Sequence, residues 1–110
     1  MSSRNQGSAA PVFAALGEPT RLRLLDRLSA EGPLSITQLT DGAGVTRQAI
    51  TRHLDVLEEV GLVKDEKQGR ERVFSLDRKR LQVARRYLNE IESQWDAAAA
   101  RLRAFVEAEG

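Results

Sequence analysis

The sequence predicts a mainly α-helical fold with one small β-hairpin and a long C-terminal helix. Three observations support this. Leucines recur at helical spacing in the first half of the chain. A charged segment around Gly69 is flanked by residues typical of strands. An apolar stripe at helical spacing then runs through the C-terminal segment.

Length and composition indicate a single soluble globular domain. The chain has 110 residues, of which 41% are hydrophobic and 30% charged, as is typical of folded domains. It contains no cysteine, which excludes disulfides and thiolate metal sites. The N-terminus lacks the apolar core of a secretory signal, and no apolar run is long enough for a membrane span. We therefore expect a cytoplasmic protein.

The pattern along the chain suggests three regions. Residues 1–11 are rich in Ser, Gly, Asn and Gln and are expected to form a disordered tail. The folded core is expected at residues 12–77 and a C-terminal helix at residues 78–110. Within the core, the apolar run at residues 12–16 predicts one or two helical turns.

The next helix is predicted to begin at Pro19, because proline favours the first helical position. Leu24, Leu25 and Leu28 form its apolar stripe, and the pair Gly32-Pro33 ends it.

Two further helices are predicted on either side of a glycine-containing turn at residues 41–44. Ser35 is a good cap for the first, with Gln38 as its capping-box partner. Thr46 caps the second, which ends at Gly61. The buried face of this second helix is predicted to comprise Ala49, Ile50, Leu54, Leu57 and Val60.

Residues 62–76 change to strand periodicity. Leu62 and Val63 open a strand, and residues 73–76 close another. Between them, Gln68 and Gly69 supply a tight turn in which glycine tolerates positive φ. The segment therefore predicts a two-stranded hairpin with a charged tip.

The C-terminal helix is predicted to be capped by Asp77 and to extend to about residue 107. Its apolar positions recur at alternating steps of three and four, as in a helix that packs lengthwise on another helix. At roughly 45 Å it is too long for this core, so part of the stripe is expected to meet a second copy of the chain. The predicted dimer interface comprises Phe13, Leu16, Leu81, Ala84, Leu88, Ile91, Trp95, Ala98, Leu102 and Phe105.

A helix-turn-helix followed by a hairpin is the element order of a winged helix-turn-helix with a C-terminal dimerisation helix. The second helix of such a pair enters the major groove of DNA. The net charge is only +1, but Arg47 and Arg52 lie near the start of this helix while Glu58 and Glu59 lie at its far end. Arg, Gln and Thr can pair with base edges. The predicted contacts to double-stranded DNA are Thr46, Arg47, Gln48, Thr51, Arg52 and His53 on the helix, and Lys67, Gln68, Arg70 and Arg72 on the wing.

Several of these residues have a second interpretation. His53 lies between the core and outward faces, as a packing or phosphate-contacting residue. The wing charges could serve solubility, and the basic run at residues 78–80 is either a phosphate contact or a solvated turn. Tyr87 and Trp95 could line an effector pocket, but the position of Trp95 on the stripe favours helix packing.

Three motifs in this order resemble the ArsR/SmtB family of bacterial repressors. Residues 15–25 (ALGEPTRLRLL) resemble the opening motif of that family, and residues 46–54 (TRQAITRHL) with residues 60–63 (VGLV) its recognition helix. Residues 67–76 resemble its wing. The resemblance covers about residues 12–108. It implies a homodimer built from the first and last helices, a partly palindromic operator, and relief of repression by an effector.

The resemblance does not extend to the metal ligands of the family. Its metal sensors commonly carry a cysteine pair in the segment that corresponds to residues 36–41, or histidines on the last helix. This chain has neither, and its one histidine is His53. Transition metals need clustered thiolate or imidazole ligands, so we expect a member without a metal cofactor. An unidentified small-molecule effector and control by protein level alone both stay open.

Two other classes of function are alternatives to a DNA-binding protein. A winged-helix module that binds only proteins would use the long helix as its working surface, and it would lack a DNA affinity that falls steeply with salt. An enzyme is disfavoured, because the lone histidine has no recognisable nucleophile partner and no phosphate-binding glycine motif is present.

Overall fold

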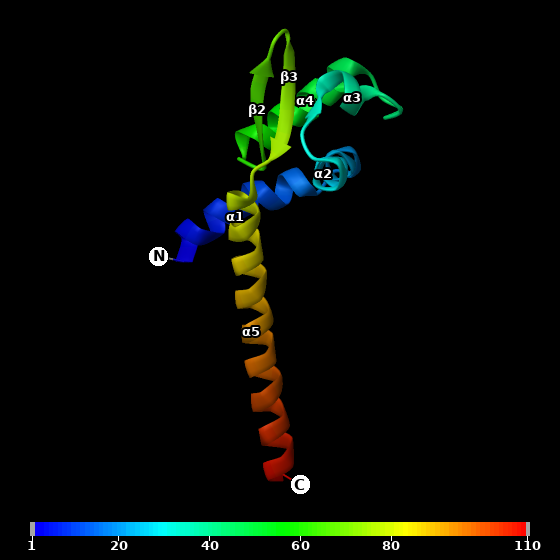
Figure 1. Ribbon diagram of the computed structural model, residues 1–110. Coiled ribbons are helices and arrows are strands. Elements are labelled where there is room, and N and C mark those ends of the chain that lie inside the picture. The colour runs from blue at the N-terminus through cyan, green and yellow to red at the C-terminus, as the bar shows by residue number, and fades with distance from the viewer. Residues whose placement is uncertain (1, 110) are drawn as a thin grey trace.

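The computed structural model describes the backbone of residues 2–109 and the side chains from Ala9 onward. The elements in chain order are α1 (Ser2–Leu16), α2 (Pro19–Glu31), β1 (Leu34–Ser35), α3 (Ile36–Thr40), α4 (Arg47–Glu59), β2 (Val63–Gln68), β3 (Glu71–Leu76) and α5 (Arg78–Glu109). Figure 1 shows α2, α3, α4 and the β2–β3 hairpin gathered into a head, from which α5 projects. The molecule is therefore elongated, with extents of 69 × 30 × 20 Å.

Helix α1 begins earlier than the sequence predicts. Residues 2–11, expected to be a disordered tail, are helical and continue without a break to Leu16. Ala9, Val12 and Ala15 share one buried face of this helix. The helix packs on α5 and crosses it near its start (Figure 1). Packing of such a face supplies most of the stability of a helix in a protein, so a polar composition did not prevent helix formation. Pro11 lies inside the helix, where it removes one helical hydrogen bond.

The predicted helix caps of the helix-turn-helix are confirmed. Ser35 and Gln38 form a reciprocal capping box at the start of α3. The Thr46 side chain accepts a hydrogen bond from the Ala49 backbone N–H at the start of α4. Gly61 follows α4 with φ of 81°, a left-handed conformation that costs glycine little. These caps fix where α4 begins and ends.

The sheet has three strands in the order β1-β3-β2, whereas the sequence predicted only the hairpin. In β1, Leu34 pairs with Phe74 and Ser35 with Val73. A strand of two residues is too short to show an alternating pattern, so sequence periodicity missed it. The strand ties the start of α3 to the hairpin.

The hairpin turn lies one residue later than predicted. Gln68 pairs with Glu71, so the turn residues are Gly69 and Arg70 rather than Gln68 and Gly69. Gly69 has φ of 63°, and glycine with positive φ at the first turn position suits the right-handed twist of the strands.

The core lies where α2, α4 and the sheet meet. Leu39, Ile50, Leu54, Leu57, Leu62 and Phe74 are fully buried there. Burial of side chains of this size stabilises a fold by roughly 1.5–3 kcal/mol each before entropy is counted. Among the described residues, no buried side-chain nitrogen or oxygen lacks a hydrogen-bond partner. The outward side chains of α4 are thus held on a closely packed scaffold.

Helix α5 leaves most of its apolar stripe uncovered. Ala84, predicted as a dimer contact, is instead buried in the core of its own chain, and Leu81 is half-buried beside it. Further along, Trp95 is 74% exposed and Phe105 64% exposed. No helix in residues 2–109 combines the length and the hydropathy that a membrane crossing requires.

Candidate nucleic-acid interface

The first turns of α4 present a polar, exposed face that carries no acidic side chain. Arg47, Gln48 and Arg52 are exposed, and the first acidic residue of the helix is Asp55. The unpaired N–H groups of a helix N-terminus favour a nearby anion. This end of α4 therefore suits the approach of a phosphate backbone.

Two predicted contact residues of α4 are partly engaged by the protein itself. The Arg47 Nη1 donates to the Thr37 Oγ1 of α3 at 3.4 Å, a long contact that leaves most of the guanidinium free. The Thr51 Oγ1 donates to the Arg47 carbonyl at 2.9 Å. Thr51 therefore offers its methyl group and oxygen lone pairs rather than its proton.

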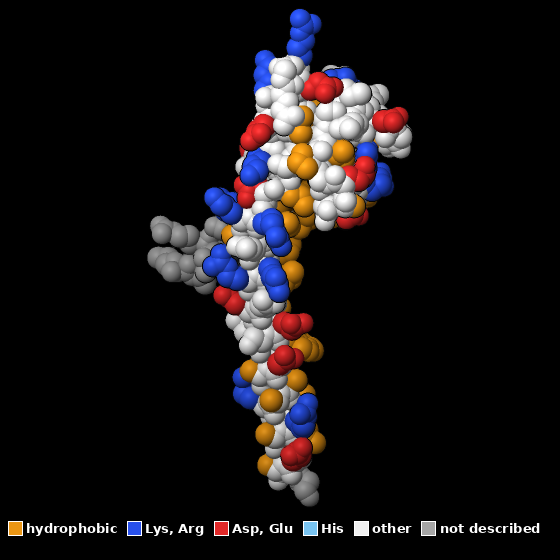
Figure 2. Space-filling model, viewed as in Figure 1, with side chains coloured by type: hydrophobic (Ala, Val, Ile, Leu, Met, Phe, Trp, Pro, Cys, Tyr) orange, Lys and Arg blue, Asp and Glu red, His pale blue; other side chains and the backbone are white. Residues whose placement is uncertain are grey.

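The tip of the hairpin lies at the far end of the molecule from the α5 C-terminus (Figure 1). Lys67, Gln68 and Arg70 are exposed there. Figure 2 shows basic side chains at this tip and hydrophobic side chains along the projecting helix. The tip, residues 67–70, carries two basic and no acidic side chains, so it is the least acidic part of the hairpin.

The structure places Arg72 differently from the predicted DNA contact. Its Nε donates to the Asp65 Oδ2 at 2.7 Å, and its Nη2 lies 3.5 Å from Glu58 and 3.7 Å from Asp55. The guanidinium also stacks over the Phe74 ring at 4.9 Å. Arg72 is therefore engaged within the protein, where it joins the wing to the second half of α4.

The carboxyl groups around Arg72 perturb one another. A hydrogen bond between the Glu58 and Asp65 side chains raises the pKa of Glu58 and lowers the pKa of Asp65. The hydrogen bond to Asp65 raises the pKa of Arg72. One guanidinium faces three carboxyl groups, so the cluster has more acid than it can neutralise.

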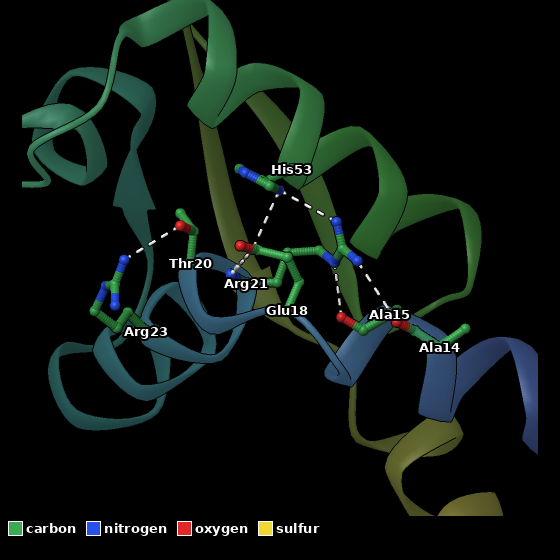
Figure 3. Close-up of polar contacts among 7 residues, drawn as sticks. All are labelled: Ala14, Ala15, Glu18, Thr20, Arg21, Arg23 and His53. Carbon is green, nitrogen blue, oxygen red and sulfur yellow. Dashed lines mark hydrogen bonds and ion pairs between the residues drawn. The ribbon is translucent and has the colours of Figure 1, made fainter.

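The structure also places His53 away from the predicted contact face. His53 is half-buried, and its Nδ1 lies 3.2 Å from the Arg21 Nη1 and 3.6 Å from the Glu18 Oε2 (Figure 3). The side chain thus points from α4 toward the start of α2, as the packing interpretation expected.

Sequence reasoning missed Glu18 and Arg21, which complete this cluster. Glu18 caps α2, and its Oε2 accepts a hydrogen bond from the Arg21 backbone N–H at 3.0 Å. Desolvation raises the pKa of Glu18, but that hydrogen bond, with smaller contributions from the neighbouring side chains and the Thr20 backbone, outweighs it, so the pKa is lowered. A carboxylate directly before Pro19 was the available signal for a helix cap.

Known proteins share both the sequence and this arrangement. The family described as "Helix-turn-helix domain" matches residues 16–66. The uncharacterised HTH-type transcriptional regulator YuzN of Bacillus subtilis is 40% identical over 74 residues, which cover 62% of this chain and 80% of that protein. The HTH-type transcriptional regulator Rv2034 of Mycobacterium tuberculosis is 33% identical over 99 residues, which cover 90% of this chain and 89% of that protein.

Among solved structures, an ArsR-like transcriptional regulator from Rhodococcus sp. RHA1 has a TM-score of 0.80 and 34% identity, and the match covers 91% of this chain and 93% of that chain. The fold and its exposed α4 face therefore define a winged helix-turn-helix transcriptional regulator that binds DNA. The chain belongs to the ArsR family of these regulators.

Proposed function

We propose that the protein is a homodimeric repressor that reads a partly palindromic operator in the cytoplasm. The observation behind this proposal is the face formed by Arg47, Gln48 and Arg52, exposed and free of acid on a rigid helix beside a basic wing tip. Arg pairs bidentately with guanine and Gln with adenine. The wing tip reaches the neighbouring backbone or minor groove.

The second subunit covers the exposed stripe of α5. Exposed Leu88, Ile91, Trp95, Leu102 and Phe105 form one continuous apolar face, and such a face on a monomer indicates an interaction site. In a twofold dimer, two copies of α4 can contact successive turns of the same face of DNA.

Charge distribution favours an antiparallel arrangement of the two α5 helices. Residues 78–86 contain five basic and no acidic side chains, whereas residues 87–109 contain five acidic and two basic ones. Antiparallel pairing sets the basic start of each helix toward the acidic part of its partner. Parallel pairing would place like charges together, which is unfavourable.

We infer that the effector is not a transition metal. The chain has no cysteine and one histidine, and that histidine contacts Arg21 and Glu18. Among the described residues, no three His, Cys, Asp or Glu side chains are grouped as metal ligands would be. A site of this kind needs several thiolate or imidazole donors.

The test is binding of the full chain to its own upstream DNA, measured by fluorescence anisotropy at two salt concentrations with a scrambled competitor. We expect tight, competitor-resistant binding that weakens as salt rises, because bound phosphates release counterions. Weak binding that is equal for both sequences would contradict the proposal and favour a module that binds proteins.

The Arg47→Ala variant tests the reading face in the same assay. We expect a loss of about 1–3 kcal/mol in operator binding if Arg47 pairs with guanine. Arg103→Ala, which removes an exposed arginine near the far end of α5, is the control and should bind like the parent. Unchanged operator affinity in a folded Arg47→Ala variant would show that Arg47 does not belong to the DNA-contacting face of α4.

A further inference from the structure

The Arg21 side chain connects three elements of the fold. Its Nε donates to the Ala15 carbonyl at 2.7 Å and its Nη2 to the Ala14 carbonyl at 3.5 Å, both at the end of α1. Its Nη1 lies 3.2 Å from the His53 Nδ1, in the middle of α4 (Figure 3). Arg21 itself lies in the first turn of α2.

These contacts suit an arginine for physical reasons. The last carbonyls of a helix lack partners within the helix, and a cation near them is favoured by the helix dipole. The Ala14 carbonyl also accepts a hydrogen bond from the Gly17 backbone N–H at 3.2 Å. A guanidinium presents several N–H groups in a fixed planar fork, so it can hold the carbonyls and an imidazole in one geometry. A neutral side chain of similar size would keep at most part of this set.

We propose that Arg21 is a positioning residue that sets the direction of α4 relative to α1. The proposal rests on the proposed function, because α1 packs on α5 and so belongs to the dimerisation part of the molecule. The angle between α1 and α4 then decides how two reading helices are spaced in the dimer. A small change in that angle costs operator affinity without removing any DNA contact.

The contact also depends on the protonation state of His53. Arg21 can donate to the Nδ1 only when that nitrogen carries no proton. A protonated imidazole loses this acceptor, repels the guanidinium, and pairs with the Glu18 carboxylate 3.6 Å away. Glu18, from the turn before α2, and Arg21, from α2, are the charged groups in contact with His53 in the described residues.

The experiment compares operator binding by the full chain and three variants, at about pH 8 and about pH 6, with dimer mass followed by sedimentation. Arg21→Gln removes the planar guanidinium group and its charge. His53→Gln leaves a side chain that does not titrate. Arg23→Gln is the matched control, because Arg23 has the same charge on the same helix, and its one side-chain hydrogen bond among the described residues is to Thr20.

We expect Arg21→Gln to stay dimeric and to bind the operator about tenfold more weakly, as loss of charge-assisted hydrogen bonds predicts. Arg23→Gln should change affinity by less than about threefold. On acidification, the parent should lose affinity by a larger factor than His53→Gln does.

Three results would overturn the proposal. One is an Arg21→Gln variant that binds like Arg23→Gln. Another is an operator affinity that depends on pH in the same way for the parent and for His53→Gln. This comparison tests the proposal even if Arg21→Gln does not fold. The third is an affinity of the parent that rises on acidification, as a direct phosphate contact by His53 would give. If the parent does not distinguish the operator from scrambled DNA, the proposed function fails as well.

Discussion

At the scale of single residues, the role of Arg72 depends on the charged side chains that the fold places around it, and its residue type alone does not predict that role. Arg72 stacks on Phe74 and faces Asp55, Glu58 and Asp65. The hydrogen bond between the Glu58 and Asp65 side chains raises the pKa of Glu58 and lowers the pKa of Asp65. The cluster joins the wing to the second half of α4, beyond the first turns that carry Arg47 and Gln48.

The raised pKa of Glu58 leads to a prediction about stability. A carboxyl group whose pKa is raised by folding stabilises the fold while it is protonated, and this contribution is lost as the pH rises through the folded-state pKa. At neutral pH the ionised Glu58 is therefore unfavourable beside Asp65 and Asp55. Glu58→Gln should raise the free energy of unfolding by about 0.5 kcal/mol near pH 7, a small value because the group is partly solvated.

Thermal unfolding at about pH 7 and about pH 4 checks this prediction, since the gain should disappear where Glu58 is protonated anyway. Glu59→Gln removes the same charge from the next, exposed residue and serves as the control. A loss of stability in Glu58→Gln at neutral pH would mean that the ion pair with Arg72 outweighs the carboxylate repulsion.

At the scale of elements, the wing and α4 behave as one unit. The hairpin is tied to α4 through Arg72 and to the start of α3 through the pairing of β1 with β3. The Thr37 hydroxyl of α3 also donates to Glu71 at 3.5 Å. The tip beyond these ties is free of the head, so its basic residues can follow the DNA backbone while the base of the hairpin stays fixed.

Arg70 at the turn of the hairpin should act as a phosphate contact. Arg70→Ala should weaken binding to all DNA sequences by a similar factor and reduce the slope of log affinity against log salt by about 1. Lys64→Ala removes an exposed cation at the base of the same hairpin and should leave the slope nearer to that of the parent. A slope that is the same in Arg70→Ala and the parent would exclude this contact.

At the scale of the whole molecule, the length of α5 is the dominant feature. Its 32 residues make a helix of about 48 Å, most of which the head does not cover. Trp95 is the largest side chain on the exposed stripe and is 74% exposed. An aromatic residue in such a position is typical of the side chains that contribute most to an interface.

Trp95→Asp should therefore yield a monomer with poor operator binding, because it places a charge at the centre of the apolar contact. Asp96→Asn, which alters the neighbouring exposed residue, should stay dimeric. Sedimentation equilibrium distinguishes the two states. A Trp95→Asp variant that remains dimeric would show that this part of α5 is not the interface.

The direction of the two helices can be tested with introduced cysteines, because the chain has none of its own. In an antiparallel pair centred on the exposed stripe, Leu88 of one subunit lies near the Phe105 of the other. Leu88→Cys mixed with Phe105→Cys should then form a disulfide-linked heterodimer on oxidation, whereas each variant alone should not cross-link. Cross-linking of each variant with itself would indicate parallel helices, since the two sulfurs must come within bonding geometry.

Much of the fold could be predicted from the sequence because its signals are local. The capping box at Ser35, the N-cap at Thr46, the left-handed glycine after α4 and the leucine stripe of α2 all depend on residues within one or two helical turns. The same is true of the exposed face of α4, because the 3.6-residue period fixes which side chains oppose the core. These features determined the winged helix-turn-helix and placed Arg47, Gln48 and Arg52 on its outer face.

Only the tertiary structure decided the features that depend on residues distant in the chain. Arg21 meets His53 across 32 positions, and β1 exists only because Leu34 and Ser35 find partners in β3. The helical state of residues 2–11 accompanies packing of α1 on α5. The polar composition near the N-terminus predicted a disordered tail. The residue types at Arg72 and His53 predicted DNA contacts. A side chain takes its role from the partners within a few ångströms, and for these residues those partners are brought together only by folding.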